Sequence, residues 1–333
     1  MISLALFAAA AASSPTPGQL RTFTDWIVGC DNGRACQASG LYPDDDFDAL
    51  TMAVVRGAER EAPPRIWINT DDLAVASLTA DGRRLPVRLM TDQGVTSVRP
   101  DDATAFVEAA KAARQLGLLD ASGTEVGHVS LAGLSAAFLY MDDQQKRVGT
   151  ATALIRKGAR PAGAVPPPPS LPLIVPPPVP KIPPRRLSKA DVAREQVAHE
   201  CEVTESEDFA PTHVRLDAAT TLALLPTPCD NGAYNFFSSA LLIDQNGKVR
   251  PARLDSPAGM SPENDNTLVN ADWDEKTQLL STYEKGRGLG DCGTMQSFAW
   301  DGAQFRLVQR SDMGECRGST DYITTWRAAV SRR

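Results

Sequence analysis

A proline-rich segment in the middle of the chain sets the strongest limit on how this sequence can fold. Residues 161–184 read PAGAVPPPPSLPLIVPPPVPKIPP and hold nearly half of the 25 prolines. Proline fixes its own φ and has no backbone N–H, so this segment can form neither a helix interior nor a central strand. We expect a polyproline II spacer, which at about 3.1 Å per residue could hold two folded parts up to roughly 75 Å apart. Such segments also serve as ligands for aromatic-lined grooves.

The length of the chain favours a folded part on each side of this segment. Its 333 residues exceed what one hydrophobic core comfortably supports, because domains usually run to about 100–200 residues. We therefore expect an N-terminal domain over residues 19–160, a Pro-rich linker over 161–187 and a C-terminal domain over 188–333.

Local patterns before the linker predict an α+β domain that contains a mixed sheet and two helices. Strand-like runs rich in Val, Ile and Trp cover Trp26–Cys30, Leu50–Arg56 and Pro64–Asn69. Asp101 or Asp102 can cap a helix. The apolar face of that helix is Phe106, Ala109, Ala110, Ala113 and Leu116, and Gly117 follows its end. A second helix is predicted by the spacing of Leu131, Leu134, Phe138 and Met141.

The pattern changes after the linker to that of an antiparallel β domain. Ser188 is placed to cap a short helix with Val192 and Val197 facing inward. Asn246-Gly247 and Asp301-Gly302 then separate strand-like runs, which is the strongest short-range signal for a β-hairpin. Residues 212–328 therefore read as a domain built from hairpins.

The N-terminus has the features of an export signal. Residues 1–14 read MISLALFAAAAASS, an apolar run that is too short to span a bilayer and ends in small residues. No Lys or Arg precedes the run, which departs from ordinary signals. We expect residues 1–18 to be a signal peptide and a disordered start. No later segment approaches the apolar length of a transmembrane helix, so a soluble exported protein is predicted.

The six cysteines fit an exported protein as well. Disulfides persist in oxidising compartments, and an even number of cysteines there suggests complete pairing. Two cysteines lie near the N-terminus and four follow the linker, so each pair can close a loop within one domain. We predict the pairs Cys30–Cys36, Cys201–Cys229 and Cys292–Cys316. Zinc is the weaker interpretation, because no CxxC pair occurs.

The net charge excludes one large class of partners. At −7 the chain lacks the excess of Lys and Arg with which proteins neutralise phosphate backbones. We expect no nucleic-acid binding and no attraction to anionic membranes.

Several quoted segments together resemble a known bacterial family. They are TDWIVGCDNGRACQASG, MDDQQKRVGTATALIRKG, PCDNGAYN, LVNADWD, KGRGLGDCG, WDGAQFRLV and MGECRG. The combination resembles the periplasmic family known as domain of unknown function 1176, from about Phe23 to Trp326. The segments FTDWIVGC and VSLAGLSAAF are also loosely similar to invasion-associated locus B proteins. The resemblance implies export to the periplasm of a Gram-negative bacterium, paired cysteines, two parts and an envelope-associated role, and it carries no activity or cofactor.

The glycine-rich segment KGRGLGDCG, residues 285–293, is the most distinctive candidate site. Phosphate loops use glycines at the start of a helix, whereas the residues that follow here read as a strand, and the GK[ST] pattern is missing. A tight turn held by Cys292–Cys316 is the favoured interpretation. That disulfide would bring Arg287, Asp291 and Arg317 together, as a set that could bind a carboxylate or an anionic glycan.

Other arrangements for catalysis are weaker. His128, His199 and His213 are the available bases for a Ser-His-Asp site, and no G-x-S-x-G segment occurs. The acidic runs at 43–48 and 142–147 resemble solvated loops, and Asp44, Asp45, Asp46 and Asp48 lack the spacing of an EF-hand. We therefore expect no metal site and no cofactor.

These observations favour a non-enzymatic protein that binds an envelope protein or an anionic glycan. Two alternatives remain open. One is a hydrolase of glycans or the cell wall that uses acids such as Asp291 or Asp44–Asp46. The other is an inhibitor of a hostile hydrolase, for which a rigid disulfide-held loop is a suitable wedge.

Overall fold

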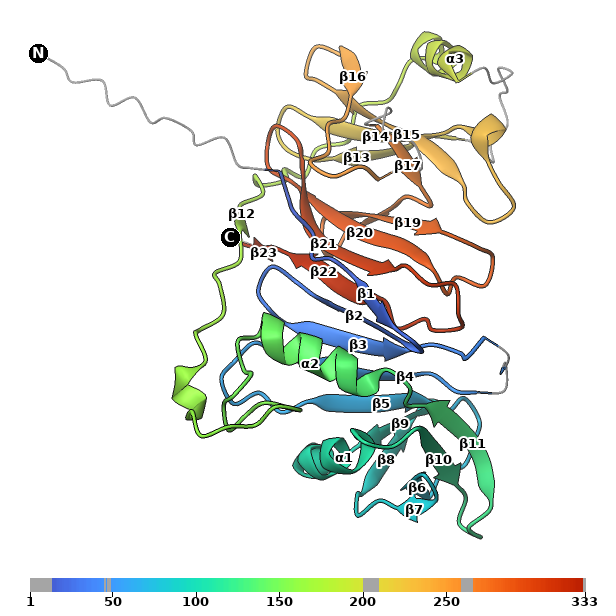
Figure 1. The fold of residues 1–333 in the computed structure, drawn as a ribbon. Helices are drawn as coiled ribbons and strands as arrows, with labels where there is room; N and C mark the ends of the chain where they lie inside the picture. The colour runs from blue at the N-terminus through green and yellow to red at the C-terminus, as the bar shows by residue number, and fades with distance from the viewer. Residues whose placement is uncertain (1–13, 45, 47–48, 200–209, 259–265, 332–333) are drawn as a thin grey trace, which may run out of the picture.

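The fold is mostly β and is built from stacked antiparallel sheets (Figure 1). The computed structural model describes the chain except residues 1–13, 45, 47–48, 200–209, 259–265 and 332–333. The predicted signal peptide therefore falls largely outside the described residues. Among the helices of the described part, none combines the length and apolar character needed to cross a membrane.

The N-terminal half forms two sheets. The first has seven strands in the order β1 (Arg21–Phe23), β2 (Trp26–Cys30), β3 (Cys36–Gly40), β4 (Met52–Arg56), β5 (Arg65–Asn69), β9 (Val95–Val98) and β8 (Leu89–Asp92). The second has four strands in the order β11 (Glu125–Ser130), β10 (Gln115–Leu119), β6 (Ser77–Ala80) and β7 (Arg83–Arg84). Two helices, α1 (Ala103–Ala110) and α2 (Leu134–Gln144), belong to the same core.

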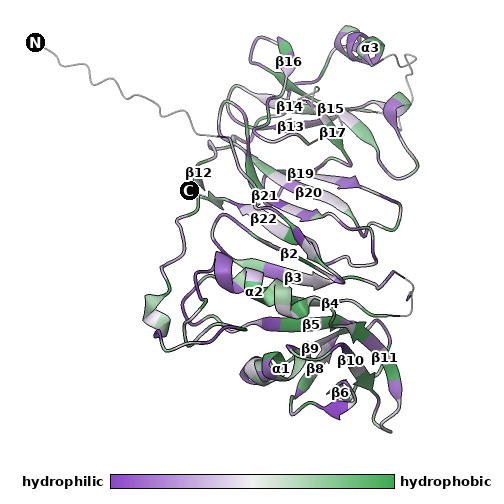
Figure 2. Cartoon of the chain, viewed as in Figure 1, coloured by the Kyte–Doolittle hydropathy of each residue, from purple (hydrophilic) through white to green (hydrophobic). Residues whose placement is uncertain are grey.

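The inner face of the seven-stranded sheet packs on α2. Trp26, Val54 and Ile66 alternate inward along their strands and join Phe106 and Phe138 in one buried cluster. The polar C-terminal turn of α2 is coloured purple in Figure 2, at the end of an otherwise hydrophobic or neutral helix. Both predicted helices are present.

Two predictions for this half are wrong. The sheets are antiparallel throughout, so there is no mixed sheet. The first helix is shorter than predicted, because Leu116 and Gly117 lie in β10 and pair with both β6 and β11. The Asp81 carboxylate accepts the N–H groups of Arg114 and Gln115 and so ties the start of β10 to β6. The hydrogen bonds of β10 to β6 and β11 therefore decide the structure of these residues, although their local sequence pattern is helical.

The C-terminal half consists of two facing sheets. One contains β13 (Thr212–Arg215), β14 (Thr221–Pro226), β15 (Phe237–Ile243) and β16 (Val249–Pro251), with β17 (Thr267–Val269) also pairing with β15. The other contains β18 (Asp272–Asp274), β19 (Leu279–Lys285), β20 (Gly293–Trp300), β21 (Phe305–Met313) and β22 (Ile323–Arg327). Leu224 and Leu242 from the first sheet share a cluster with Phe298 and Phe305 from the second.

Both predicted hairpins are confirmed. The β15–β16 and β20–β21 pairs flank the two turns, and Gly247 (φ 82°) and Gly302 (φ 99°) adopt the left-handed conformation that these turns require. The helix α3 (Lys189–Ala198) begins at Ser188, whose hydroxyl accepts the N–H of Asp191 in a capping box. Val192 packs on the sheet, but the inward orientation predicted for Val197 is wrong, since that side chain is 64% exposed.

Two of the three predicted disulfides are confirmed. Cys30–Cys36 joins β2 to β3, and Cys292–Cys316 joins the start of β20 to the segment before β22. Cys229 is disulfide-bonded, whereas Cys201 lies outside the described residues, so the pair Cys201–Cys229 stays a prediction.

The proline-rich segment differs from the spacer that its composition predicts. We call residues 161–187 the strap. It runs along one side of the stacked sheets (Figure 1) and contributes β12 (Leu173–Ile174), which pairs in parallel with β23 (Ala329–Val330). Arg34 Nη2 donates to Pro167 O (3.0 Å), and Arg60 Nε donates to Val165 O (2.9 Å). Proline keeps its carbonyl as an acceptor, so neighbouring donors bind the strap although it donates little itself.

The two halves also contact each other directly, because the outer face of the seven-stranded sheet packs on β22 and the loop before it. Ile27 and Ile323 share a buried cluster there. Gly29 faces this contact and has no side chain. The Cβ atom of any other residue at this position would lie 2.7 Å from Leu20 Cδ2 and 3.1 Å from Ile323 Cγ2. The glycine therefore permits the close approach of β2 and β22.

Asp321 fixes this interface. Its Oδ1 accepts the indole N–H of Trp67 (2.9 Å) and its Oδ2 accepts the amide of Asn69 (2.8 Å). Its main-chain oxygen accepts from Gln37 Nε2 and Ser39 Oγ, both at 2.8 Å. Burial raises the pKa of the Asp321 carboxyl, and the two hydrogen bonds oppose that rise.

The raised pKa of Asp321 predicts how the free energy of unfolding depends on pH. Because the native state holds this proton more tightly than the unfolded chain, the group contributes stability that is present below the ordinary Asp pKa of about 4 and is lost as pH rises through the native pKa. The variant Asp321→Asn cannot titrate. We expect the free energy of unfolding of Asp321→Asn, minus that of the wild type, to increase from pH 4 to pH 7 in urea titrations.

The exposed Asp274 provides the matched control. Hydrogen bonds from Thr277 and Lys276 hold the pKa of the Asp274 carboxyl below its usual range, so the difference for Asp274→Asn should not increase from pH 4 to pH 7. A difference for Asp321→Asn that also fails to increase would contradict the assignment of a raised pKa to the Asp321 carboxyl.

Candidate functional site

The structure brings together two of the three residues predicted to form a site. Residues 286–292 form the turn between β19 and β20, where Arg287 Nε donates to Asp291 Oδ1 (2.7 Å). Asp291 Oδ2 also accepts the N–H of Gly318 (2.7 Å), and this carboxylate side chain is only 3% exposed. The hydrogen bond from Arg287 holds the pKa of Asp291 below its usual range. The carboxylate thus joins the turn to the segment that carries Cys316.

The main chain of Arg317 lies beside Asp291, because the next residue is Gly318, but the Arg317 side chain has other partners. Its Nη2 donates to Asp25 Oδ1 (2.6 Å), its Nε to Tyr42 O (2.8 Å) and its Nη1 to Thr24 O (2.9 Å). The Arg317 guanidinium therefore joins the C-terminal half to the N-terminal half. Pairing with Asp25 satisfies its charge across the interface.

A Ser-His-Asp arrangement occurs that the sequence did not indicate. The His199 ring bonds Ser239 Oγ through Nε2 and Asp230 Oδ2 through Nδ1, each at 2.9 Å. These are the contacts of a nucleophile, a base and an orienting acid. Ser239, however, lies within β15, paired on both sides, and has no exposed surface. The hydroxyl ties α3 to the sheet and offers a substrate no approach in this conformation.

Two of the acidic candidates, Asp46 and Asp142, serve structural roles, whereas Asp44 is 89% exposed and lies 3.5 Å from Arg317 Nε. Asp46 bonds His128 Nε2, while Asp45 and Asp48 lie outside the described residues. Asp142 is buried rather than solvated, and its carboxylate accepts the N–H groups of Leu154 and Ile155. In the described part of the chain, no group of three or more His, Cys, Asp or Glu side chains is arranged to hold a metal ion.

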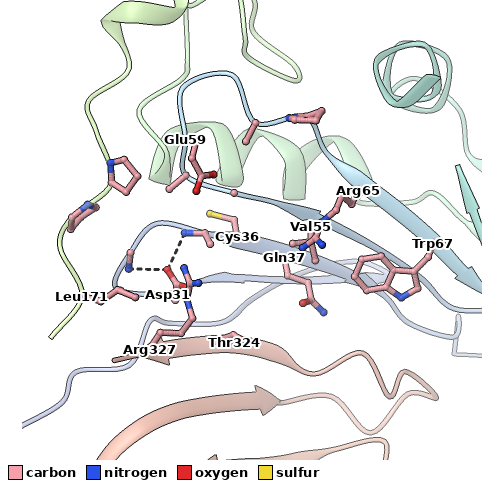
Figure 3. A pocket seen from close by; sticks show the side chains of 18 residues that line it. Asp31, Cys36, Gln37, Val55, Glu59, Arg65, Trp67, Leu171, Thr324 and Arg327 are labelled. Carbon is pink, nitrogen blue, oxygen red and sulfur yellow. Dashed lines mark hydrogen bonds and ion pairs between the residues drawn. The ribbon is translucent and has the colours of Figure 1, made fainter. Parts of the chain in front are cut away.

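A pocket of 740 Å³ lies where the strap, the seven-stranded sheet and β22 meet (Figure 3). We call it the strap pocket. Its floor is the outer face of β3, β4 and β5, with Gln37, Val55, Arg65 and Trp67. One wall is the loop of residues 57–63, and the others are formed by the strap and by Thr324 and Arg327 of β22. The loop contributes Gly57, Ala58, Glu59, Ala62 and Pro63, and the strap contributes Pro168, Pro169 and Leu171. The volume is within the usual range of small-molecule sites.

Two buried arginines hold the wall formed by residues 57–63. Arg147, fully buried, donates to Arg60 O (2.6 Å) and to the carbonyl of Glu59. Arg56 donates through Nε to Ala62 O (2.9 Å) and through Nη2 to Thr152 O (2.7 Å). Burial, with the nearby charge of Arg147, lowers the pKa of Arg56 to about 10. Burying the charges of two arginines costs free energy. Their hydrogen bonds to the carbonyls of this loop nevertheless fix its position.

Asp142 provides the negative charge for this cluster. Its Oδ1 lies 3.5 Å from Arg56 Nη1, and both side chains are buried. Burial raises the pKa of Asp142, against the pull of the two backbone N–H groups and of both arginines. The segment DDQQKR therefore supports the pocket from within the core.

The remaining wall is held by a second buried carboxylate. Asp31 Oδ1 accepts the N–H groups of Gly33 (2.8 Å) and Ala35 (2.9 Å), and Oδ2 bonds Arg327 Nε. Asn32 exchanges two hydrogen bonds with the main chain of Arg327. The β2–β3 turn, closed by Cys30–Cys36, thereby binds the exposed edge of β22.

Two charged side chains of the pocket remain available to a ligand. Glu59 and Arg65 are exposed, and within the described residues neither side chain forms a hydrogen bond or ion pair. Figure 3 shows Glu59 on the loop side and Arg65 on the sheet side. The Trp67 indole N–H is already bound by Asp321, so the ring offers the pocket its carbon surface.

Sequence reasoning missed this pocket for a clear reason. Its residues span Asp31 to Arg327 and meet only when the C-terminal half docks. The one local signal was the segment MDDQQKR, which places acids and bases directly after the apolar residues of the second predicted helix and could have suggested a buried ionic cluster.

Removing Arg147 should disrupt the loop. In Arg147→Met, the carbonyls of Gly57, Glu59 and Arg60 lose their buried donor, and Asp142 loses a nearby cation. We expect a loss of about 3–5 kcal/mol in the free energy of unfolding, measured in urea. Lys146→Met, at the exposed neighbour, should cost less than about 0.5 kcal/mol. Equal effects of the two changes would contradict the role given to Arg147.

Ser239 should not react as a catalytic serine. Because its hydroxyl has no exposed surface, we expect no phosphonylation by a fluorophosphonate probe, as read by peptide mass spectrometry, under conditions in which a serine hydrolase is fully labelled. Labelled Ser239 that disappears in His199→Ala would instead establish a working triad.

Comparisons with other proteins agree on one family. The model of the family described as "Protein of unknown function (DUF1176)" matches residues 20–329. The chain is 33% identical over 339 residues to the "Uncharacterized protein YpfG" of Escherichia coli strain K12, with 92% of each chain covered. No solved structure matches the chain. On the family match and this relative, the chain belongs to the DUF1176 family.

Proposed function

We propose that this protein is an exported binding protein without catalytic activity, and that the strap pocket is its binding site. The observation that carries the proposal is the construction of the pocket. Three separate segments of the chain meet there, and buried charged groups fix two of its walls. Preorganised walls reduce the free energy lost on binding, since less has to be ordered when a ligand arrives.

The periplasm of a Gram-negative bacterium is the compartment we propose. The N-terminal apolar run and the two described disulfides support it, since such bonds persist in oxidising compartments. Osmotic-shock fractionation that leaves the protein with the cytoplasm would contradict this location. Separate hydrophobic clusters before and after the strap also support residues 19–160 and 188–333 as two folding units.

An envelope protein or an anionic glycan remains the proposed type of partner. The Ser-His-Asp arrangement gives no support to hydrolysis, because the serine is buried. The loop of Arg287 and Asp291 supports the fold, as its carboxylate is satisfied internally.

Blocking the pocket tests the proposal. Val55 lies on the floor, so Val55→Trp should fill part of the space, while Met90→Trp places the same side chain at an exposed site on β8. Calorimetric titration with short peptides and with acidic oligosaccharides should find a ligand for the wild type. We expect Met90→Trp to bind that ligand normally and Val55→Trp to bind it at least tenfold more weakly.

Two results would overturn the proposal. One is that no member of either ligand class binds the wild type. The other is binding that Val55→Trp leaves unchanged, although both variants melt near the temperature of the wild type.

A further inference from the structure

Residues next to the strap pocket already bind an extended polypeptide, namely the strap itself. Side chains of Arg34 and Arg60 donate to its carbonyl groups, and the N–H of Ala329 donates to Pro172 O (2.8 Å). Ser331 N donates in turn to Ile174 O (2.9 Å). This is the chemistry of peptide recognition, in which main-chain groups supply the hydrogen bonds.

The charges within the pocket have a defined arrangement. Asp31 and Arg327 neutralise each other, so they add no net charge. Glu59 and Arg65 remain, and they approach the space from different sides, the loop and the sheet (Figure 3). A ligand that satisfies both needs a cationic group and an anionic group at separate positions.

The apolar part of the pocket lining is suited to short apolar side chains. Val55 and the carbon face of Trp67 lie on the floor, and Pro168 and Pro169 lie opposite on the strap. Asp321 holds the indole in place through its N–H, which makes the aromatic surface rigid.

We propose that the strap pocket binds a short peptide with free ends, its amino group near Glu59 and its carboxylate near Arg65. This inference rests on the proposed function and specifies the ligand. An anionic glycan fits less well, because it would bring negative charges towards Glu59 and offer that carboxylate no cationic group. A peptide with free ends matches both exposed charges of the pocket, and its main chain is of the kind that the neighbouring residues already bind in the strap.

The experiment uses the full chain and alanine peptides of two to five residues. Each is titrated calorimetrically with free ends, with an acetylated amino group and with an amidated carboxylate. We expect one length to bind the wild type best, because both ends must reach their partners. Acetylation and amidation should each weaken that binding about three- to tenfold, as expected for one charge-assisted contact.

Variants of Glu59 and Arg65 test which end of the peptide each residue binds. In Glu59→Gln, acetylation should have little further effect, and in Arg65→Gln the same should hold for amidation, as a double-mutant cycle requires for a direct contact. The exposed residues Glu61 and Arg83, which do not line the pocket, supply the controls Glu61→Gln and Arg83→Gln. All four variants change exposed side chains, and melting temperatures check that they fold.

The outcomes separate the two levels of the proposal. If digalacturonate binds in a manner that Val55→Trp abolishes and the peptides do not bind, the peptide is the wrong ligand and the pocket remains a binding site. If peptides bind but neither capping nor the variants matter, the assignment of Glu59 and Arg65 is wrong. If neither class binds, both proposals fail.

Discussion

The burial of the Asp321 carboxylate against the outer face of the seven-stranded sheet is the interaction on which the arrangement of the two halves depends. A sheet with one covered face usually leaves the other in water, and here residues from the far end of the chain occupy that second face. Four donors from β3 and β5 converge on one residue. A shift of this loop would leave these buried and half-buried donors without partners, so the hydrogen bonds favour the observed register. That register positions Thr324 and Arg327 beside the strap, and so it defines the pocket.

The elements that could be predicted from sequence are those with local causes. The limits of β2, the capping box at Ser188, the two glycine turns and the spacing of α2 each follow from residues close together in the chain. The end of α1 could not be found in this way, since strand pairing with β6 and β11 decided it. The strap could not either, because composition excludes helix and central strand but does not reveal a partner such as β23.

The same distinction applies to the candidate site. Arg287 and Asp291, four residues apart, pair as the sequence suggested, whereas Arg317 bonds Asp25, which lies 292 residues away. A disulfide brings main chains together, yet each side chain still takes the partner that the whole fold offers. Glu59 and Arg65 carried no signal of their own. Their role arises from Arg147 and Arg56, which fix the loop beside them, and from the docking of β22.

The closure of the chain on itself has a consequence for its assembly. Gly18 donates to Thr325 O, and Asn32 exchanges hydrogen bonds with Arg327, at a sequence separation of 295 residues. Contacts between such distant segments form late and slowly, because the intervening chain must be ordered before they bring any gain. The first sheet can form early in synthesis, but its outer face stays uncovered until the last strands arrive. The strap waits for the same event, since β23 follows β22. A truncated or stalled chain would therefore expose this face, whereas a complete chain covers it in its final folding step.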